Sequence, residues 1–183
     1  MIDQEKLSKF LAYILRHNPQ EFNLTLDAQG FTSVDSVWAA IQKRFPNGRY
    51  SWKDVLEIVK GDKTGKKRYE IKEERIRAMY GHNAAVTEIT YRPFKPPAVL
   101  FHGTNEPALD LIRLDGLKAL SRQYVHLTTS HERAMTVASR RSDEIIVLQI
   151  LSEEAHAAGV VFYRPETEHF LSKAIPAEFI RFP

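Results

Sequence analysis

Residues 51–78, SWKDVLEIVKGDKTGKKRYEIKEERIRA, contain the change of pattern that decides the fold of the first half of the chain. Ser51 is suited to cap a helix, and apolar residues then recur with the spacing of one helix face until Gly61 ends it. The segment KKRYEIK alternates as a strand does, and RIRAMYGHN follows across a charged turn at Glu73 and Glu74. This stretch therefore predicts a helix followed by a two-stranded hairpin.

Two further helices are predicted before this stretch. Residues 7–15 place apolar side chains at helical spacing, and the helix ends before Pro19. A second helix begins after Ser33 and is broken by the sequence PNG that starts at Pro46. Three helices followed by a hairpin is the order of a winged-helix unit. Some winged-helix units bind nucleic acid and others serve as protein interaction modules, so the fold alone does not decide between these two functions.

The second half of the chain has a different pattern. Residues 91–99, YRPFKPPAV, contain three prolines and are typical of a stiff linker. After the linker, strands and helices alternate, and the mostly apolar, β-branched run at residues 144–151 predicts a buried strand. We expect strands at 99–102, 124–127, 144–151, 160–163 and 179–182, and helices at 106–114 and 130–139.

The two halves also differ in charge. The chain of 183 residues carries a net charge of +3. Residues 1–92 contain 16 basic and 12 acidic side chains, whereas residues 93–183 contain 10 and 11. Only the first half is therefore suited to approach phosphates. We predict an α+β protein with a nucleic-acid-binding winged-helix lobe at 1–92, a linker at 93–98 and a second lobe at 99–183.

Several function classes are disfavoured by what the sequence lacks. Without cysteine there is no disulfide, no thiolate nucleophile and no Cys-ligated zinc. The motifs GxGxxG, GxxxxGK[ST], HExxH and GxSxG do not occur, which argues against Rossmann, P-loop, zinc-protease and serine-hydrolase sites. The beginning MIDQEKLSKF is unlike a signal peptide, and no apolar run is long enough to span a membrane. We expect an intracellular, cytoplasmic protein that is monomeric.

Arginine and histidine gather at the expected ends of elements. Each has an ordinary interpretation: a basic pair at a helix end complements the helix dipole, a basic run is a solvated face, and a strand histidine lies in the core. The histidine that precedes Gly103 stands apart, because glycine allows a ligand to approach the backbone closely. The candidate residues are Arg16, His17, Arg68, His102, Gly103, Thr104, Ser121, Arg122 and His126.

Seven strings of the sequence together resemble one enzyme family. They are, in chain order, LSKFLAYILRHNP, LTLDAQGF, KKRYEI, RIRAMYGHN, PPAVLFHGT, GLKALSRQYVHLT and IPAEFI. Their pattern is similar to that of the NAD-dependent RNA 2'-phosphotransferases, the tRNA 2'-phosphotransferases among them, over about residues 7–182. The most specific pieces are the LRH that ends the first helix, the HGT, and the SRxxVHL.

The resemblance implies a winged-helix RNA lobe followed by an ADP-ribosyltransferase-like lobe that binds NAD+. It implies removal of an internal RNA 2'-phosphate, such as some ligases leave at a tRNA splicing junction, with NAD+ consumed as a substrate and no metal required. The 2'-phosphate first attacks the anomeric carbon of the nicotinamide ribose, which expels nicotinamide and leaves 2'-phospho-ADP-ribosylated RNA. The ribose 2''-hydroxyl then attacks the phosphate, releasing 2'-OH RNA and ADP-ribose 1'',2''-cyclic phosphate.

The resemblance also implies roles for the candidate residues. The catalytic quartet would be Arg16, His17, Arg68 and Arg122. It would act in a cleft between the lobes, where the three members from the first lobe grip the phosphate and mainly promote the second step, and the fourth serves both steps. The NAD+-binding residues would be His102, Gly103, Thr104, Ser121 and His126.

The sequence departs from the family pattern in two places. Residues 80–83 are YGHN, where QGHS is common, and Tyr124 stands where many members carry His.

Two other functions remain open. One is an ADP-ribosyltransferase that caps terminal phosphates of RNA or DNA and stops after the first step. The other is a winged-helix nucleic-acid-binding regulator, although the third helix carries as many acidic as basic side chains, which is unfavourable for a helix that enters a major groove.

Overall fold

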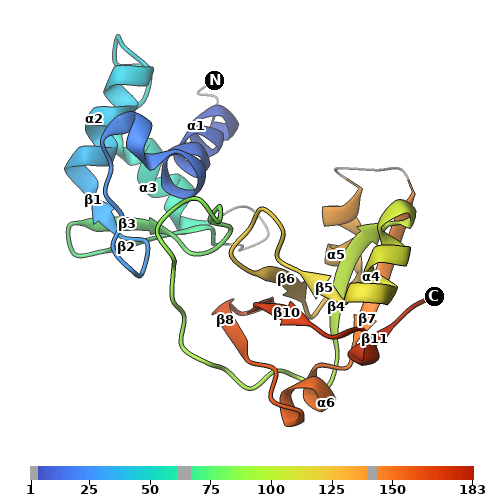
Figure 1. Ribbon diagram of the computed structural model, residues 1–183. Helices are drawn as coiled ribbons and strands as arrows, with labels where there is room; N and C mark the ends of the chain where they lie inside the picture. The colour runs from blue at the N-terminus through green and yellow to red at the C-terminus, as the bar shows by residue number, and fades with distance from the viewer. Residues whose placement is uncertain (1–3, 62–66, 140–143) are drawn as a thin grey trace. The chain divides into compact units, whose positions relative to one another are not determined.

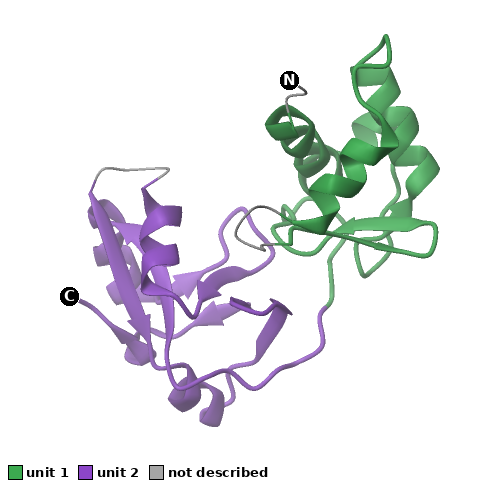
Figure 2. Ribbon diagram, turned by 180° about the vertical axis from the view of Figure 1, so that it is seen from behind, with its two compact units in different colours: residues 1–90 green, residues 91–183 purple. Residues whose placement is uncertain are grey.

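The computed structural model describes residues 4–61, 67–139 and 144–183 of the chain. The chain divides into two compact units, unit 1 at residues 1–90 and unit 2 at residues 91–183 (Figure 2). Each unit combines helices with antiparallel sheets, so the expected mixture of α and β structure is confirmed.

The helices of unit 1 lie where the sequence predicts them (Figure 1). Helix α1 spans Gln4–Ala12 and continues into a π-helical turn, η1, at Tyr13–His17. A short 3-10 turn, η2, follows at Pro19–Phe22. Helix α2 spans Val34–Arg44 and helix α3 spans Trp52–Lys60. The sequence did not predict that the first helix ends in a π turn.

The predicted serine caps are present at two helix starts. The Ser33 hydroxyl accepts a hydrogen bond from the Asp35 N–H at 3.2 Å. The Ser51 backbone N–H and hydroxyl both donate to Asp54 Oδ2 at 2.7 Å. These bonds satisfy groups that the first helical turn leaves without an intrahelical partner, which is why the helices begin there.

The predicted hairpin is also confirmed and gains a third strand. Strand β2, Tyr69–Lys72, pairs antiparallel with β3, Arg75–Ala78, and β1, Thr32–Ser33, adds on the other side of β3. The turn of the hairpin contains Glu73 at a φ of 57°. The apolar stripe that runs through α1 and η1 supplies much of the core of unit 1, and its fully buried members are Leu7, Leu11, Ile14 and Leu15.

Unit 2 is built on a six-stranded antiparallel sheet with the order β11-β7-β4-β6-β9-β8. The strands are β4 at Leu100–Asn105, β6 at Val125–Thr128, β7 at Ile145–Ile150, β8 at Phe162–Glu166, β9 at His169–Ser172 and β11 at Ile180–Arg181. A separate pair joins β5 at Leu117–Lys118 to β10 at Ala174–Ile175. The helices are η3 at Glu106–Ala108, α4 at Leu109–Asp115, α5 at His131–Ala138, α6 at Ser152–Ala157 and η4 at Ala177–Phe179.

The predicted strand that contains His102 ends later than expected. The sequence placed the end at His102, whereas β4 continues to Asn105 because its last residues pair with β7, Thr104 with Ile146 and Asn105 with Ile145. The sequence HGT therefore lies inside a strand and not at its end.

The prolines expected to form a linker begin beside β8. Pro93 forms a bridge with Tyr163, and the Phe94 N–H donates to the Phe162 carbonyl at 2.8 Å.

Helix α6 and strand β9 were not predicted. Among the residues that the structure describes, no helix is long and apolar enough to cross a membrane.

Candidate active site

The π-helical turn η1 positions two of the candidate residues, Arg16 and His17. The turn is closed by a hydrogen bond from the Asn18 N–H to the Tyr13 carbonyl at 2.9 Å, which spans one residue more than an α-helical bond. Such wide turns are frequent at functional sites. Both candidate side chains are half-buried, and the chain leaves the helix directly after them.

The guanidinium of Arg16 lies over two tyrosine rings and has unused donors. Its central carbon lies 5.6 Å from the centroid of the Tyr69 ring and 5.1 Å from that of Tyr80. Its Nε and Nη2 atoms are buried and have no hydrogen-bond acceptor among the described residues. A buried cation stabilised by rings but lacking acceptors is unusual, because buried donors are normally satisfied. An oxyanion is the ligand that would complete it.

Arg68 is tied to the same cluster through its neighbour in sequence. It is half-buried just before β2, and its carbonyl accepts a hydrogen bond from the Met79 N–H at 3.0 Å. The next residue, Tyr69, contacts Arg16 and donates its hydroxyl to the Ser8 carbonyl at 2.8 Å. The three candidates of unit 1 therefore belong to two adjoining segments, the end of η1 and the start of β2.

The segment that departs from the family pattern also packs on Arg16. The Tyr80 ring lies over its guanidinium, and the Asn83 N–H donates to the Arg16 carbonyl at 2.9 Å. The Asn83 side chain closes its own turn by accepting from the Ala85 N–H at 2.9 Å. Tyr80 and Asn83, the two residues of this segment that differ from the family pattern, therefore contact or flank the candidate site.

Gly103 in unit 2 is required by packing within the sheet layer. A Cβ at this position would come within 2.1 Å of the Ala134 carbonyl oxygen of α5. Because side chains alternate along a strand, His102 and Thr104 project from the face of the sheet opposite to α5. The sequence suggested the approach of a ligand as a reason for this glycine, and the structure shows that a helix approaches it closely.

The two neighbours of β4 pair with it to very different extents. All six residues of β4 are in register with β7, from Leu100 opposite Ile150 to Asn105 opposite Ile145. With β6 the register is a single pair, Phe101 opposite Thr128. The sheet therefore parts between β4 and β6 directly beyond Phe101, at the position where the HGT residues lie.

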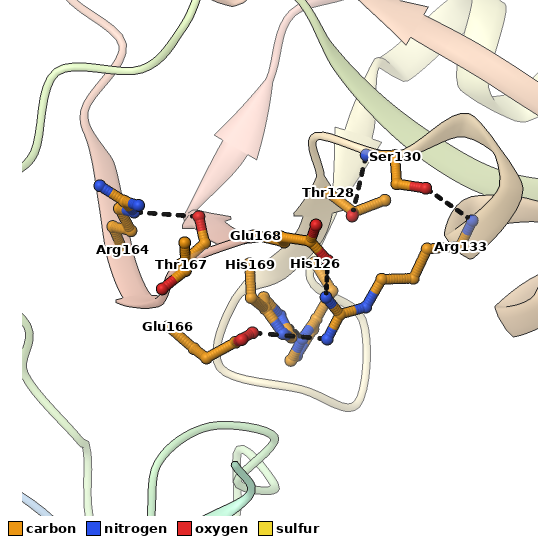
Figure 3. A network of polar contacts seen from close by, with 9 residues as sticks. All are labelled: His126, Thr128, Ser130, Arg133, Arg164, Glu166, Thr167, Glu168 and His169. Carbon is orange, nitrogen blue, oxygen red and sulfur yellow. Dashed lines mark hydrogen bonds and ion pairs between the residues drawn. The ribbon is translucent and has the colours of Figure 1, made fainter. Parts of the chain in front are cut away.

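A chain of histidines connects the strands around this parting, as Figure 3 shows in part. The His102 Nδ1 atom is 2.9 Å from the His126 carbonyl oxygen, and His126 Nδ1 is 2.9 Å from His169 Nε2. Between the last two atoms one ring donates and the other accepts. His126 is half-buried and joins this polar chain, so the ordinary interpretation as a core histidine does not describe it. The sequence argument missed His169 because it missed β9, although EHFLS could have suggested a further strand.

Arg133 of α5 fixes the end of the hairpin that carries His169. Its Nη1 donates to Glu168 Oε2 at 2.6 Å, and its Nη2 lies 3.4 Å from Glu166 Oε2. In Figure 3 its guanidinium reaches both carboxylates at the turn between β8 and β9. The Arg133 and Glu166 side chains are 19% and 15% exposed, so this pair is largely shielded from water, whereas Glu168 is 53% exposed. Two nitrogens of Arg133 are thus engaged by carboxylates of the hairpin turn.

The remaining candidates precede β6. Ser121 is exposed and Arg122 is half-buried, and the Arg122 N–H closes a turn by donating to the Ala119 carbonyl at 3.0 Å. Tyr124, where many family members carry His, is buried with its ring 5.4 Å from that of Tyr163. This departure is therefore part of the packing. In the described part of the chain, no group of three or more His, Asp or Glu side chains is arranged to hold a metal ion.

Comparison with known proteins decides the family. The model of the RNA 2'-phosphotransferase, Tpt1 / KptA family matches residues 3–174. The chain belongs to the RNA 2'-phosphotransferase family. A probable RNA 2'-phosphotransferase from Acetivibrio thermocellus is 38% identical over 185 residues, covering 100% of this chain and 98% of the relative. One from Pseudomonas aeruginosa is 39% identical over 176 residues, covering 95% and 94%.

A third relative, from Fusobacterium nucleatum, is 36% identical over 184 residues and covers 100% of both chains. Removal of a 2'-phosphate from RNA is the activity that membership of the RNA 2'-phosphotransferase family supports for this enzyme. The resemblance drawn from the seven strings is thereby confirmed at the level of the family.

Proposed function

We propose that this RNA 2'-phosphotransferase transfers the internal 2'-phosphate of an RNA to NAD+, which it consumes as a substrate. Unit 1 would be a winged-helix module that holds the RNA, and unit 2 an ADP-ribosyltransferase-like module that holds NAD+. Nicotinamide leaves when a 2'-phosphate oxygen bonds to the anomeric ribose carbon. The ribose 2''-hydroxyl then attacks the same phosphorus, the bond to the RNA 2'-oxygen breaks, and ADP-ribose 1'',2''-cyclic phosphate is released.

The observation that carries the proposal is the state of Arg16. Its buried Nε and Nη2 atoms have no acceptor in the described residues, and Tyr69 and Tyr80 hold the planar group in place. Two N–H groups on one edge of a guanidinium match two oxygens of a phosphate. A 2'-phosphate bound there would satisfy both donors and be oriented for attack.

The neighbours of Arg16 fit the second step. Arg68, one residue from Tyr69, would add a second positive charge on the phosphate as it is transferred. His17, next to Arg16 in the same turn, would return a proton to the RNA 2'-oxygen as that bond breaks, because the ordinary pKa of histidine lies near neutral pH.

The residues around the parting of β4 and β6 fit NAD+. His102 and Thr104 project from the same face of β4, where their polar atoms can bind ribose hydroxyls. Beyond Phe101 the backbone of Gly103 is not in register with β6, so its polar groups are suited to the carboxamide of nicotinamide. Nicotinamide in NAD+ is a cationic leaving group, so this pocket needs to orient the ribose more than to supply acid.

The decisive experiment uses an RNA with one internal 2'-phosphate. Incubation of the protein with this RNA and NAD+ is expected to yield free nicotinamide, RNA with a 2'-hydroxyl, and ADP-ribose cyclic phosphate. Omission of NAD+ should leave the RNA unchanged. RNA that loses its phosphate without NAD+ would contradict the proposal, and RNA that stays ADP-ribosylated would indicate the capping activity in its place.

Two variants separate the steps. Arg122→Ala should block nicotinamide release, whereas Arg16→Ala should slow the second step more than the first and let ADP-ribosylated RNA accumulate. The matched control is Arg113→Ala, because Arg113 is an exposed arginine of α4 that lies over Phe182. An Arg122→Ala protein with the full rate of nicotinamide release would disprove the role assigned to Arg122.

A further inference from the structure

Unit 1 has a hollow whose lining does not include Arg16. It measures about 420 Å³ and lies between α1, the turns η1 and η2, and the end of α2. Its lining is aromatic at the floor and basic at the rim. The floor includes Phe10, Tyr13 and Phe22, and the rim includes Lys6, Lys9 and Arg44. We call it the α1–α2 groove.

The aromatic rings at the floor of the α1–α2 groove pack edge to face. The Phe10 ring meets the rings of Phe22 and Phe45 edge to face, with centroids 5.2 Å apart in each pair. Tyr13 stands at the side of the floor and is 37% exposed. An exposed ring beside a fixed aromatic cluster is a platform on which a flat, unpaired base can stack.

The rim of the α1–α2 groove is positively charged. Lys6, Lys9 and Arg44 line it, and Lys43 Nζ lies 5.7 Å from the centroid of the Phe22 ring. Lys9 forms an ion pair with Glu5, but both side chains are 76% exposed, and such surface pairs are weak enough for a phosphate to compete.

One acidic residue, Glu21, also lines the α1–α2 groove. Its carboxylate accepts a hydrogen bond from the Tyr13 hydroxyl, which raises the pKa of Tyr13 above its ordinary value. The tyrosine ring therefore stays neutral at physiological pH. The three cations that line the groove exceed the one acidic charge, so the groove attracts polyanions.

We propose that the α1–α2 groove binds a single-stranded segment of RNA that flanks the 2'-phosphorylated nucleotide. The combination of cations along an aromatic floor is the chemistry of proteins that bind unpaired strands. Tyr13 of the groove and His17 of the candidate site are the first and last residues of one turn, η1, so the two sites adjoin. The identity of the bound strand as substrate rests on the proposed function, but strand binding itself requires neither NAD+ nor a 2'-phosphate.

The test measures binding of a fluorescein-labelled single-stranded RNA of about 12 nucleotides, without a 2'-phosphate, to the full chain by fluorescence anisotropy. For the double variant Lys6→Ala/Arg44→Ala we expect the Kd to rise roughly tenfold. The plot of the logarithm of the association constant against the logarithm of the salt concentration should become less steep by about 1.4, because two fewer phosphates of the single strand are neutralised. The matched control is Lys53→Ala/Lys60→Ala, two exposed lysines of α3, which should change the Kd less than about twofold.

The stacking surface has its own pair of variants. Tyr13→Ala should weaken RNA binding by roughly tenfold, because a base loses its platform. Tyr13→Phe keeps the ring and removes only the hydroxyl bonded to Glu21, so its affinity should match that of the unchanged protein. Far-UV circular dichroism would verify that each variant is folded before its affinity is compared.

Two results would overturn the assignment. One is unchanged RNA affinity in folded Lys6→Ala/Arg44→Ala and Tyr13→Ala proteins. The other is a loss in the α3 control pair that exceeds the loss in the groove pair, which would place the strand on α3. The binding assay contains no NAD+, so it is independent of the proposed function. If the unchanged protein fails to transfer the phosphate but the groove variants lose RNA affinity as expected, the proposed function is refuted and the groove assignment is retained.

Discussion

Arg16 in unit 1 and Arg133 in unit 2 are partly buried arginines in opposite situations. The Arg133 guanidinium reaches two carboxylates, Glu166 and Glu168, at the turn of one hairpin. The Arg16 guanidinium lies over two tyrosine rings, and two of its nitrogens have no acceptor among the described residues. The first arrangement neutralises the charge inside the protein, whereas the second keeps the charge in place and leaves two of its donors without an acceptor in the described part of the chain.

The difference shows that the neighbours of an arginine decide its use. Aromatic rings stabilise the charge of an arginine and leave its N–H groups unbonded. Carboxylates neutralise the charge and also accept hydrogen bonds from the N–H groups. A structural arginine should therefore matter for stability, and a ligand-binding arginine for activity. Three substitutions separate these two uses of an arginine, and a fourth measures an exposed contact for comparison.

Arg16→Ala should abolish most activity with little loss of stability. If Arg16 binds the 2'-phosphate as proposed, the turnover of 2'-phosphorylated RNA should fall by about 100-fold or more, because a preorganised donor to the phosphate is removed. The free energy of unfolding should change by less than about 1 kcal/mol, because the loss of the cation–π interactions with the two rings is offset by the removal of buried donors that lack an acceptor among the described residues. Steady-state kinetics and urea unfolding of the same preparation measure both. The control is Arg75→Ala, which removes an arginine paired with Asp27.

Arg133→Ala should show the reverse pattern. Removing the cation leaves Glu166, whose side chain is 15% exposed, without its partner, so we expect a loss of about 2 kcal/mol in stability. Far-UV circular dichroism should follow the unfolding, because both tryptophans, Trp38 and Trp52, lie in unit 1. Arg133→Lys should recover part of the loss. Unchanged stability in Arg133→Ala would mean that the two ion pairs contribute nothing.

Tyr80→Leu should have an intermediate effect on activity. It removes one of the two rings that hold Arg16, so we expect turnover to fall about threefold to tenfold, the range of one cation–π contact. Tyr80→Phe keeps the ring and should retain nearly full turnover. If both variants lose activity equally, the hydroxyl and not the ring is what matters at this position.

Asp54→Ala tests the smallest effect, an exposed contact in a helix cap. The Ser51 N–H and hydroxyl lower the pKa of the Asp54 carboxyl below its ordinary value, so its contribution is full above that value and is lost as the pH falls through the folded-state pKa. We expect Asp54→Ala to cost roughly 0.5–1 kcal/mol at neutral pH. Tryptophan fluorescence in urea should show that the cost shrinks as the pH is lowered below the ordinary pKa of aspartate. A cost independent of pH would contradict this.

The sequence predicted most elements correctly where local signals were strong. Ser33 and Ser51 marked helix starts, and the alternation around Tyr69 marked a strand, because caps and periodicity are local properties. The end of β4 was misplaced since Thr104 and Asn105 are held in the strand by residues about 40 positions away, in β7. Such pairing leaves no local trace in a single sequence.

The candidate site was predictable in part for the same reason. The residues of unit 1 stand in short, recognisable strings, so Arg16, His17 and Arg68 could be chosen from sequence. The cation–π contacts of Arg16 bring together residues more than 50 positions apart, and the pair His126–His169 spans 43 positions. Neither could be foreseen before the strands were placed, and so Tyr80 could be noted only as a departure.

The wide turn η1 also has a meaning for how such a site can arise. An α-helix rotates by about 100° per residue, so one extra residue in a helix would normally turn every later side chain away from its place. Here the π turn takes up one residue locally, and the apolar stripe from Leu7 to Leu15 still faces the core. It is equivalent to a one-residue insertion near the end of an ordinary helix. A single insertion of this kind redirects the last side chains without redesigning the core, which makes the direction of Arg16 and His17 open to evolution independently of the stability of unit 1.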